Sequence, residues 1–346
     1  TEWEIPVPLY PLLLAPIYKE KVWGGRGLKE LGRVLPGGSE TMIGESWELA
    51  DLSVTNPSGG GGEAARSLIR NGPLSKRTLG DVIRDFGPMV TGTMQLSPDG
   101  SFPLLLKYLD ARENLSVQVH PSEAYAAEHP DVHLKSEAWY VVATEPGAKI
   151  YRGLVAGVDR ELFQVAAQDG SLETLLRSEP VEPGQCIYLP SGTVHALGGG
   201  VLVAEVQTAS DTTFRIFDWG RTGRELHIQE ALACIDFTGK EPETVDFEDV
   251  AADDGDWAMR PLVSCEHFQM NEWTALGTVP HAFVSDELSV LMVVSGSAII
   301  TWGEGEGRTL MVGTGDTVVL PAGLASVEVH AKLDLTLLEI APPRTN

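Results

Sequence analysis

The segment EPGQCIYLPSGTVHAL (residues 182–197) is echoed near the end of the chain by GTGDTVVLPAGLASVEV (residues 313–329). Each copy has a glycine, then an apolar run of the length typical of a strand, and then Leu-Pro-x-Gly. When the copies are aligned, His195 in the first lies opposite Ser326 in the second. The pattern therefore predicts a repeated β unit whose two copies differ in their polar residues.

The repeat extends upstream of these segments. Aligning Val141–Val142 with Val293–Val294 places Glu137 opposite Ser289. A histidine and a glutamate of the first copy are thus both serines in the second. We expect two β-barrels, with metal-ligating side chains only in the first.

Working outward, the residues from Phe102 onward form short apolar or alternating runs that favour strands, in the order FPLLLKYLDA, NLSVQVH, EAWYVVA, KIYRGL, QCIYLPSGTVHAL and VLVAEVQT. Two stretches favour helices instead, about 63–90 and 158–178, the first with Ser75 as a helix cap. The sequence therefore predicts a mainly β protein with helical insertions.

The length of 346 residues exceeds the usual size of one domain. Residues 241–256, EPETVDFEDVAADDGD, hold eight acids and no base, which is typical of a solvated linker. We expect a catalytic domain over residues 1–240, this acidic linker, and a second β domain without metal over residues 257–346.

The charge balance limits the possible partners. Lys and Arg number 25 against 49 Asp and Glu, which gives a net charge of −24. Nucleic acid and anionic membranes are poor partners for such a surface. A phosphorylated substrate would be repelled too, so an enzyme for one must concentrate its few cations at the site.

Several features predict a cytoplasmic location. No run approaches the ~18 apolar residues of a membrane span, and the proline-broken N-terminal stretch does not resemble a signal peptide. The three cysteines, Cys186, Cys234 and Cys265, have no metal-binding spacing. We interpret them as core thiols in a reducing compartment.

Four polar residues are candidates for a metal site. Gln118 and His120 are two apart on a predicted strand, so their side chains share one face. Glu137 begins the next strand, and His195 follows a strand that can lie alongside. This mixed nitrogen and oxygen set suits one divalent ion. Zinc fits, and iron, manganese or cobalt fit as well.

Longer motifs carry a specific resemblance. PIYKEKVWGG, GESWEL, FPLLLKYLDARENLSVQVHPSEAYA, KSEAWYVV, PGQCIYLPSGTVHALGGGVLVAEVQTASDTTFRIFDWGR and RELH follow one another in order. Together they resemble type I phosphomannose isomerase in its short bacterial form. The resemblance implies two cupin-type jelly-roll β-barrels with helical insertions. It also implies one zinc ion on Gln118, His120, Glu137 and His195, and interconversion of mannose 6-phosphate and fructose 6-phosphate in the cytoplasm.

The resemblance also assigns roles in moving a proton between C1 and C2 of the open-chain sugar through a cis-enediol. Lys135 and Arg215 match residues that act on or bind the substrate, and Glu205 and Asp211 match acidic residues of the pocket. We expect either acid to be the base or to position it. Ser116, on the strand face of Gln118, fits a contact with the phosphate or a sugar hydroxyl. Trp47 and Glu48 of GESWEL are expected to wall the pocket or support the sheet.

The sequence is also compatible with other interpretations. Larger members of the family carry a histidine before the lysine, where this chain has Leu134. The two histidines and Glu137 also suit an iron dioxygenase, and fold does not fix chemistry. A non-catalytic sugar-phosphate-binding cupin and an isomerase for another phosphosugar are further alternatives. The oligomeric state is left as monomer or homodimer.

Overall fold

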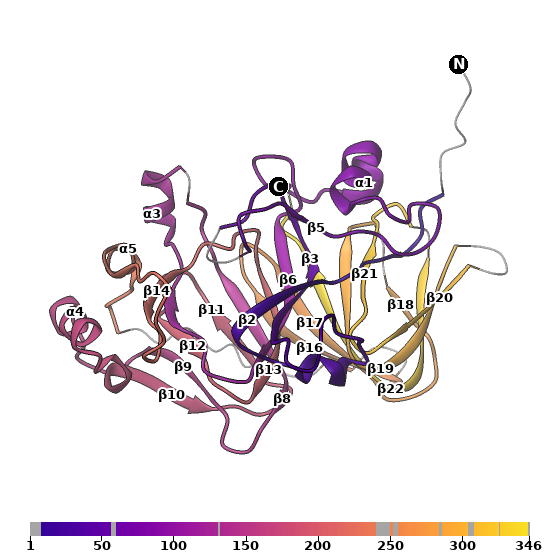
Figure 1. Ribbon diagram of the computed structural model, residues 1–346. Coiled ribbons are helices and arrows are strands. Elements are labelled where there is room, and N and C mark those ends of the chain that lie inside the picture. The colour runs from indigo at the N-terminus through magenta and orange to yellow at the C-terminus, as the bar shows by residue number, and fades with distance from the viewer. Residues whose placement is uncertain are drawn as a thin grey trace.

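The computed structural model describes residues 8–56, 60–130, 132–239, 250–251, 255–283, 286–303, 308–324 and 326–344. Within them the protein is mainly β, with a few short helices, as expected (Figure 1). The strands form sheets of nine, six and five strands and one two-stranded ribbon, and every pairing within them is antiparallel.

Two of the sheets come from the first part of the chain. The six-stranded sheet has the order β11-β8-β13-β6-β2-β3, with bounds Cys186–Leu189, Glu137–Thr144, Val201–Thr208, Leu104–Ala111, Ile17–Gly25 and Ile43–Leu49. The five-stranded sheet has the order β10-β9-β12-β7-β14, with bounds Leu176–Pro180, Lys149–Leu154, His195–Leu197, Val117–Val119 and Phe214–Phe217. The ribbon pairs β4 (Asp51–Leu52) with β5 (Ala65–Arg66).

The nine-stranded sheet holds the C-terminal part of the chain. Its main path is β1-β21-β19-β22-β17-β16-β15, with bounds Leu12–Leu13, Thr317–Leu320, Ser289–Trp302, Val327–Ala341, Gln269–Ala275, Trp257–Ser264 and Val250–Ala251. β18 (His281–Phe283) pairs with β22, and β20 (Thr309–Gly313) pairs with β19. Because β1 pairs with β21, a piece of the N-terminal segment belongs to this sheet.

The internal repeat appears as matching strand register. Glu137 opens β8 opposite Leu189 of β11, and Ser289 opens β19 opposite Leu320 of β21. These pairings agree with both alignments made from the sequence. The order β11-β8-β13-β6 likewise corresponds to β21-β19-β22-β17. The two halves are therefore built on the same plan.

Alternating side chains divide the molecule into layers. On β8, Ala138 and Tyr140 pack in a core shared with Met270 and Ile340 of the nine-stranded sheet. The intervening Trp139 packs instead with residues of β9 and β12 in the five-stranded sheet. The central strands of the six-stranded sheet are thus covered on both faces, which explains why β6, β8 and β13 are nearly continuous apolar runs. Figure 1 shows the six-stranded sheet between the other two sheets.

The helices lie mainly at the margins of the sheets (Figure 1). Their bounds are α1 Leu79–Phe86, α2 Pro88–Thr91, α3 Glu123–Glu128, α4 Arg160–Asp169 and α5 Ile228–Cys234, with the 3₁₀ turns η1 Gly27–Leu31 and η2 Leu172–Leu175. The helical stretch predicted over 158–178 corresponds to α4 and η2. Asp159 caps α4 by accepting a hydrogen bond from the Leu162 amide, and Gly170 ends it in the left-handed region.

The helix predicted over 63–90 is wrong in its first half. Ala65, Ser67 and Ile69 are buried while the residues between them are exposed, which is the period of a strand. Backbone pairing of β5 with β4 fixes this extended conformation. The helix α1 begins only after Thr78, whose side chain accepts from the Asp81 amide. The cap is therefore Thr78 and not Ser75.

Some predictions fall on residues that the structure does not describe. Most of the linker predicted over 241–256 lies outside the described residues, although β15 within it pairs with β16. The division into domains remains a prediction. All three cysteines are free thiols. Across the described residues, no helix has both the length and the apolarity that a membrane span requires.

Candidate active site

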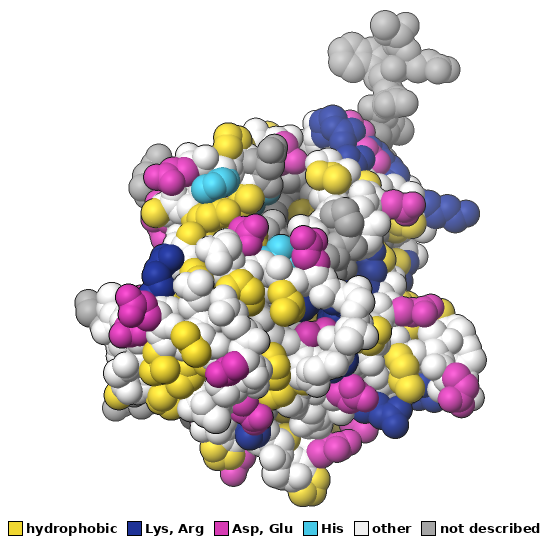
Figure 2. All heavy atoms as spheres, turned by 60° about the vertical axis from the view of Figure 1, so that its left-hand side comes forward, with side chains coloured by type: hydrophobic (Ala, Val, Ile, Leu, Met, Phe, Trp, Pro, Cys, Tyr) yellow, Lys and Arg dark blue, Asp and Glu magenta, His cyan; other side chains and the backbone are white. Residues whose placement is uncertain are grey.

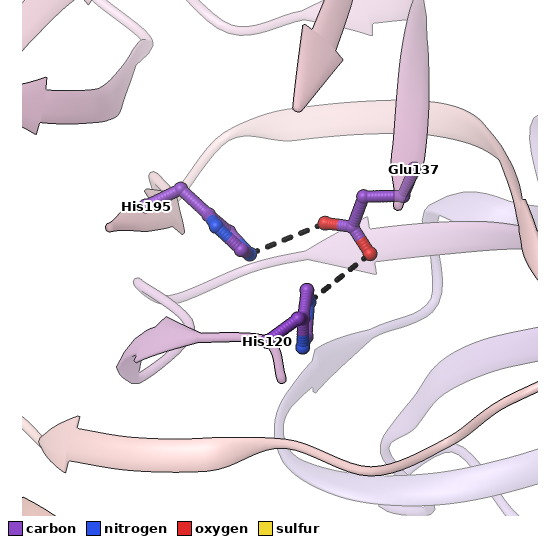
Figure 3. A group of neighbouring side chains, drawn as sticks. All are labelled: His120, Glu137 and His195. Carbon is purple, nitrogen blue, oxygen red and sulfur yellow. Dashed lines mark ion pairs between the residues drawn. The ribbon is translucent and has the colours of Figure 1, made fainter. Parts of the chain in front are cut away.

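Strand register brings the predicted metal ligands together. His195 in β12 lies directly opposite Gln118 in β7, and His120 follows β7 by one residue. Glu137 opens β8 in the facing six-stranded sheet and points its carboxylate between the two imidazoles (Figure 3). Its Oε1 lies 3.2 Å from His195 Nε2, and its Oε2 lies 3.2 Å from His120 Nε2. All three side chains are almost fully buried.

Backbone carbonyls set which nitrogen of each histidine carries the proton. Nδ1 of His120 lies 3.1 Å from the Thr212 carbonyl, and Nδ1 of His195 lies 2.8 Å from the Thr193 carbonyl. A carbonyl only accepts, so each Nδ1 donates. Burial, together with Lys135, lowers the pKa of His120 to about 3, so its ring is neutral. Its unprotonated Nε2 therefore accepts from Lys135 Nζ at 3.0 Å and lies 3.2 Å from Glu137 Oε2.

This arrangement fits a cation. Neither oxygen of Glu137 is aligned for a hydrogen bond, although Lys135 Nζ is an ion-pair neighbour of Oε2 at 2.6 Å. Burial alone would raise the pKa of Glu137, but Lys135 and His120 hold it well below its ordinary value. A buried carboxylate facing imidazole lone pairs is a cluster of acceptors, which suits a divalent ion.

Gln118 fits as a fourth donor. Its carboxamide nitrogen lies 3.2 Å from His195 Nε2, on the same side of the site as the other ligands. A half-turn of the carboxamide exchanges nitrogen and oxygen, so the same side chain can present Oε1 to an ion. The four predicted ligands are therefore in one place, and nitrogen and oxygen donors of this kind suit zinc among other divalent ions.

A cavity of about 390 Å³ opens beside the cluster and reaches Gln118 and Lys135. Six cationic side chains line it: Lys19, Lys21, Lys107, Lys135, Arg215 and Arg224. Among the described residues, the acids that line it are Glu20, Glu45 and Glu205. In a chain of net charge −24 this concentration is unusual, and acidic side chains are scattered over the face shown in Figure 2. The expected gathering of cations is confirmed.

Arg215 sits in β14, directly opposite Gln118 of β7. Its Nη1 donates to the Glu225 carbonyl at 2.9 Å, whereas its buried Nε has no partner among the described residues. Burial lowers the pKa of this guanidinium, and the neighbouring Arg224 lowers it further. A cation in this position favours a bound anion.

Glu205 is held by its neighbours on the six-stranded sheet. It lies between Lys107 of β6 and Trp139 of β8 in the sheet register. Trp139 Nε1 donates to Oε1 at 2.9 Å, and Lys107 Nζ lies 3.0 Å from Oε2. Lys107 also donates to Gln207 Oε1 at 2.7 Å. Lys107 and Glu205 are thus a fixed, charge-balanced pair on the cavity wall, with Trp139 and Gln207 as their supports.

The structure brings Ser116 to the cavity but does not bring Asp211 there. Ser116 lines the cavity beside Gln118, as its position on the strand predicted. Asp211 lines a second cavity of about 360 Å³. Its Oδ2 accepts from the backbone amides of Asn56 and Gly60 at 2.7 and 2.9 Å. Its direct contacts are therefore with a loop.

The sequence analysis did not identify four of the cations that line the cavity: Lys19, Lys21, Lys107 and Arg224. Lys19 and Lys21 share one face of β2, and their spacing of two residues could have indicated a pair of cations on that face. Lys107 was visible as a lysine inside the apolar run LLLKYLDA, where a charge without a partner is costly. Nothing in the sequence indicated that Arg224 reaches the cavity.

Two facing β-sheets bring together two histidines, a glutamate and a glutamine, a donor set that suits a divalent ion. The cavity beside them is lined by cations, which suits an anionic small molecule. Together these features define the class of the protein: a β-sheet protein with a candidate metal site next to a candidate anion site. Residues 12–147 match the catalytic domain of type I phosphomannose isomerase. The chain is 32% identical over 333 residues to mannose-6-phosphate isomerase ManA of Bacillus subtilis, covering 92% of this chain and 96% of that protein. The chain therefore belongs to the mannose-6-phosphate isomerase family.

Two further comparisons agree with this assignment. A probable mannose-6-phosphate isomerase of B. subtilis, GmuF, is 35% identical over 338 residues, covering 95% of this chain and 98% of that protein. The crystal structure of the mannose 6-phosphate isomerase from B. subtilis superposes with a TM-score of 0.83 at 28% identity, covering 96% of this chain and 99% of that one. The similarity thus extends over nearly the whole chain.

Proposed function

We propose that this protein interconverts mannose 6-phosphate and fructose 6-phosphate through a cis-enediol, using one zinc ion. The observation that carries the proposal is the buried cluster of His120, Glu137 and His195 beside a cavity lined by six cations. Relatives named for this activity align over more than nine-tenths of the chain. The cluster suits a metal, and the cations suit a phosphorylated sugar.

Gln118, His120, Glu137 and His195 would hold the ion. When bound, zinc supplies Lewis acidity that polarises the oxygens at C1 and C2 of the open-chain sugar. The Thr212 and Thr193 carbonyls would keep the histidines in the tautomer whose Nε2 is unprotonated, as coordination requires.

Side chains of the cavity would do the remaining work. Lys135 lines the cavity beside the ligands, and we assign it to moving the proton between C1 and C2. Arg215 would neutralise charge that develops on a sugar oxygen, since its guanidinium faces the cavity opposite Gln118. Ser116 would bind a substrate hydroxyl or the phosphate.

The two acids have different supporting evidence. Glu205 lies on the cavity wall, and we propose that it acts as base or positions Lys107, to which it is paired. Asp211 contacts the backbone of Asn56 and Gly60 instead of the cavity. A direct catalytic role for Asp211 has no support in these contacts.

We also propose that the chain forms two cupin-type jelly-roll barrels, the second without metal. The matching register of the two halves supports this plan, and Ser289 and Ser326 stand where the first half has ligands. Three free thiols are in keeping with the proposed cytoplasmic location. The oligomeric state stays a prediction of monomer or homodimer.

The proposal predicts that activity depends on the metal cluster. Chelator-treated protein reloaded with zinc should convert mannose 6-phosphate to fructose 6-phosphate. His195→Asn should lower kcat/KM by about 100-fold or more, since even residues that only support metal ligands contribute about 10- to 100-fold. His267→Asn is the control, because His267 pairs with Glu266 away from the cavity.

Folded, zinc-loaded protein that does not turn over mannose 6-phosphate would exclude the proposed reaction. Turnover of another phosphosugar would then change the identity of the proposed substrate but keep the proposed type of reaction, an isomerisation. Iron in the isolated protein together with oxygen consumption would instead indicate a dioxygenase.

A further inference from the structure

Lys19 is set apart from the other lysines of the cavity. Three of the four are ion-paired: Lys21 with Glu45 at 3.1 Å, Lys107 with Glu205 at 3.0 Å and Lys135 with Glu137 at 2.6 Å. Within the described parts of the chain, Lys19 has no carboxylate in ion-pairing range. Glu45 lies opposite it in the register of β2 and β3, but Lys21 and Trp47 Nε1 occupy that carboxylate.

Two structural features fix the position of the Lys19 ammonium. Its Nζ lies 4.8 Å from the centre of the Trp47 ring, and Lys107 Nζ lies 5.3 Å from the centre of the same ring. Lys19 Nζ also donates to the Gly60 carbonyl at 2.6 Å. An ammonium has three N–H groups, so two remain after this bond. Lys19 and Lys107 therefore form a doubly positive spot over one aromatic ring.

Gly60 is itself held in place by Asp211. The carboxylate of Asp211 accepts from the Gly60 amide at 2.9 Å and from the Asn56 amide at 2.7 Å. Gly60 has no room for a side chain, because a Cβ there would lie 2.4 Å from Cβ of Thr55. Asp211 thus fixes the backbone to which Lys19 is anchored, from outside the cavity that Lys19 lines.

We propose that Lys19 binds the phosphate group of the sugar substrate and that Asp211 is a positioning residue for it, acting through Gly60. The inference rests on the proposed function. A phosphate monoester is the small-molecule group that best satisfies an ammonium with free N–H groups and no carboxylate partner. Lys19 keeps its bond to Gly60 while its other N–H groups donate to phosphate oxygens.

The first test compares Lys19→Met with Lys149→Met. Lys149 also lies over an aromatic ring, 4.7 Å from the centre of Tyr151, but it does not line the cavity. Loss of a charged hydrogen bond predicts that Lys19→Met raises KM for mannose 6-phosphate by about 10- to 100-fold. The inhibition constant of inorganic phosphate should rise by the same factor, while kcat stays within about threefold. The Lys149 variant should change none of these.

The second test concerns Asp211. Asp211→Ala should raise KM and the phosphate inhibition constant, and Asp211→Asn should restore most of the loss because its amide oxygen still accepts from the backbone. Adding Asp211→Ala to Lys19→Met should raise KM no further, since one residue acts through the other. Effects that add would overturn the positioning role.

Other outcomes separate this inference from the proposed function. If Lys19→Met lowers kcat and leaves KM and phosphate inhibition unchanged, Lys19 acts at the reacting carbons and the proposal is wrong. Unchanged constants would also overturn it. If the wild-type protein shows no turnover, the proposed function fails, and calorimetric binding of inorganic phosphate to wild type and Lys19→Met still tests the role of Lys19.

Discussion

At the scale of a single residue, the lysines that line the cavity keep the carboxylate of Glu45 charged. Its carboxylate accepts from Trp47 Nε1 at 2.6 Å and pairs with Lys21. Burial alone would raise its pKa, but Lys21 and Lys107 outweigh burial and lower the pKa to about 2. Since the folded value lies below the ordinary one, the charged carboxylate stabilises the fold above about pH 4.5. That contribution is lost as pH falls through 2.

We therefore predict that protonation of Glu45 accounts for part of the stability that the protein loses in acid. Between pH 6 and pH 3 the free energy of unfolding of the wild type should fall by about 2 kcal/mol more than that of Glu45→Gln, which has no charge to lose. Urea unfolding of both proteins at the two pH values measures the difference. Parallel losses would mean that Glu45 is not held as an anion.

Single residues also show what the sequence reveals about a site. The spacing of Gln118 and His120 placed them on one strand face, and the repeat singled out Glu137 and His195, because strand periodicity is a local rule. Asp211 was expected in the pocket from the family resemblance alone. Its actual partner, Gly60, lies 151 positions earlier, and no local pattern links the two. Long-range partners of this kind come only from the fold.

At the scale of elements, β3 joins the cavity wall to the nine-stranded sheet. Trp47 and Glu45 face one way, while Glu48 faces Arg33, which is bound to both carboxylate oxygens at 2.6 and 2.7 Å. Arg33 also donates to the carbonyl of Gly315, in the turn before β21. The expectation that Trp47 and Glu48 support the sheet agrees with these contacts.

Arg33→Met should cost about 3–5 kcal/mol of stability, because it leaves the buried charge of Glu48 without a cation and, among the described residues, with only the Ser46 hydroxyl as a donor. A matched pair exists in the other half, where Arg260 binds Glu272 and the carbonyl of Gly184. That pair is more exposed, with side chains 33% and 14% accessible against 10% and 2% for Arg33 and Glu48. Arg260→Met should therefore cost less. Equal losses in urea unfolding would show that burial does not govern these pairs.

At the scale of elements, the sequence predicted the positions of strands better than the point at which a helix begins. The run from Ala65 to Ile69 reads equally well as a helix or a strand, since it mixes small, charged and aliphatic residues. Pairing between β4 and β5 makes this segment a strand, and a short stretch of sequence around it does not reveal that pairing. The β8 and β11 strands were predicted correctly because each contains an uninterrupted apolar run, AWYVVA in β8 and CIYL in β11.

For the whole molecule, the largest core lies between the six- and nine-stranded sheets. Tyr140 and Leu106 pack there with Met270 and Ile340. A chain ending at Gly239 would expose this face, at about 1.5–3 kcal/mol for each large apolar side chain. We predict that such a fragment aggregates and gives no cooperative unfolding transition. A monomeric fragment with a sharp transition, followed by circular dichroism, would contradict this.

The repeat predicted the common plan of the two halves, because its alignment reproduces the pairing of Glu137 with Leu189 and of Ser289 with Leu320. It did not predict that β1 crosses into the C-terminal sheet. Two residues, Leu12 and Leu13, make that crossing, and their apolar character suits any interior surface. Which surface they cover depends on packing across the whole chain.

The proposed metal ligands come from two different sheets, and this has a mechanical consequence. His195 and Gln118 belong to the five-stranded sheet, while Glu137 belongs to the six-stranded one. An ion bound by residues of both sheets would cross-link them, since the sheets could not slide or separate without breaking a coordination bond. By holding the two sheets at a fixed separation, the ion would also set the width of the cavity, which residues of both sheets line.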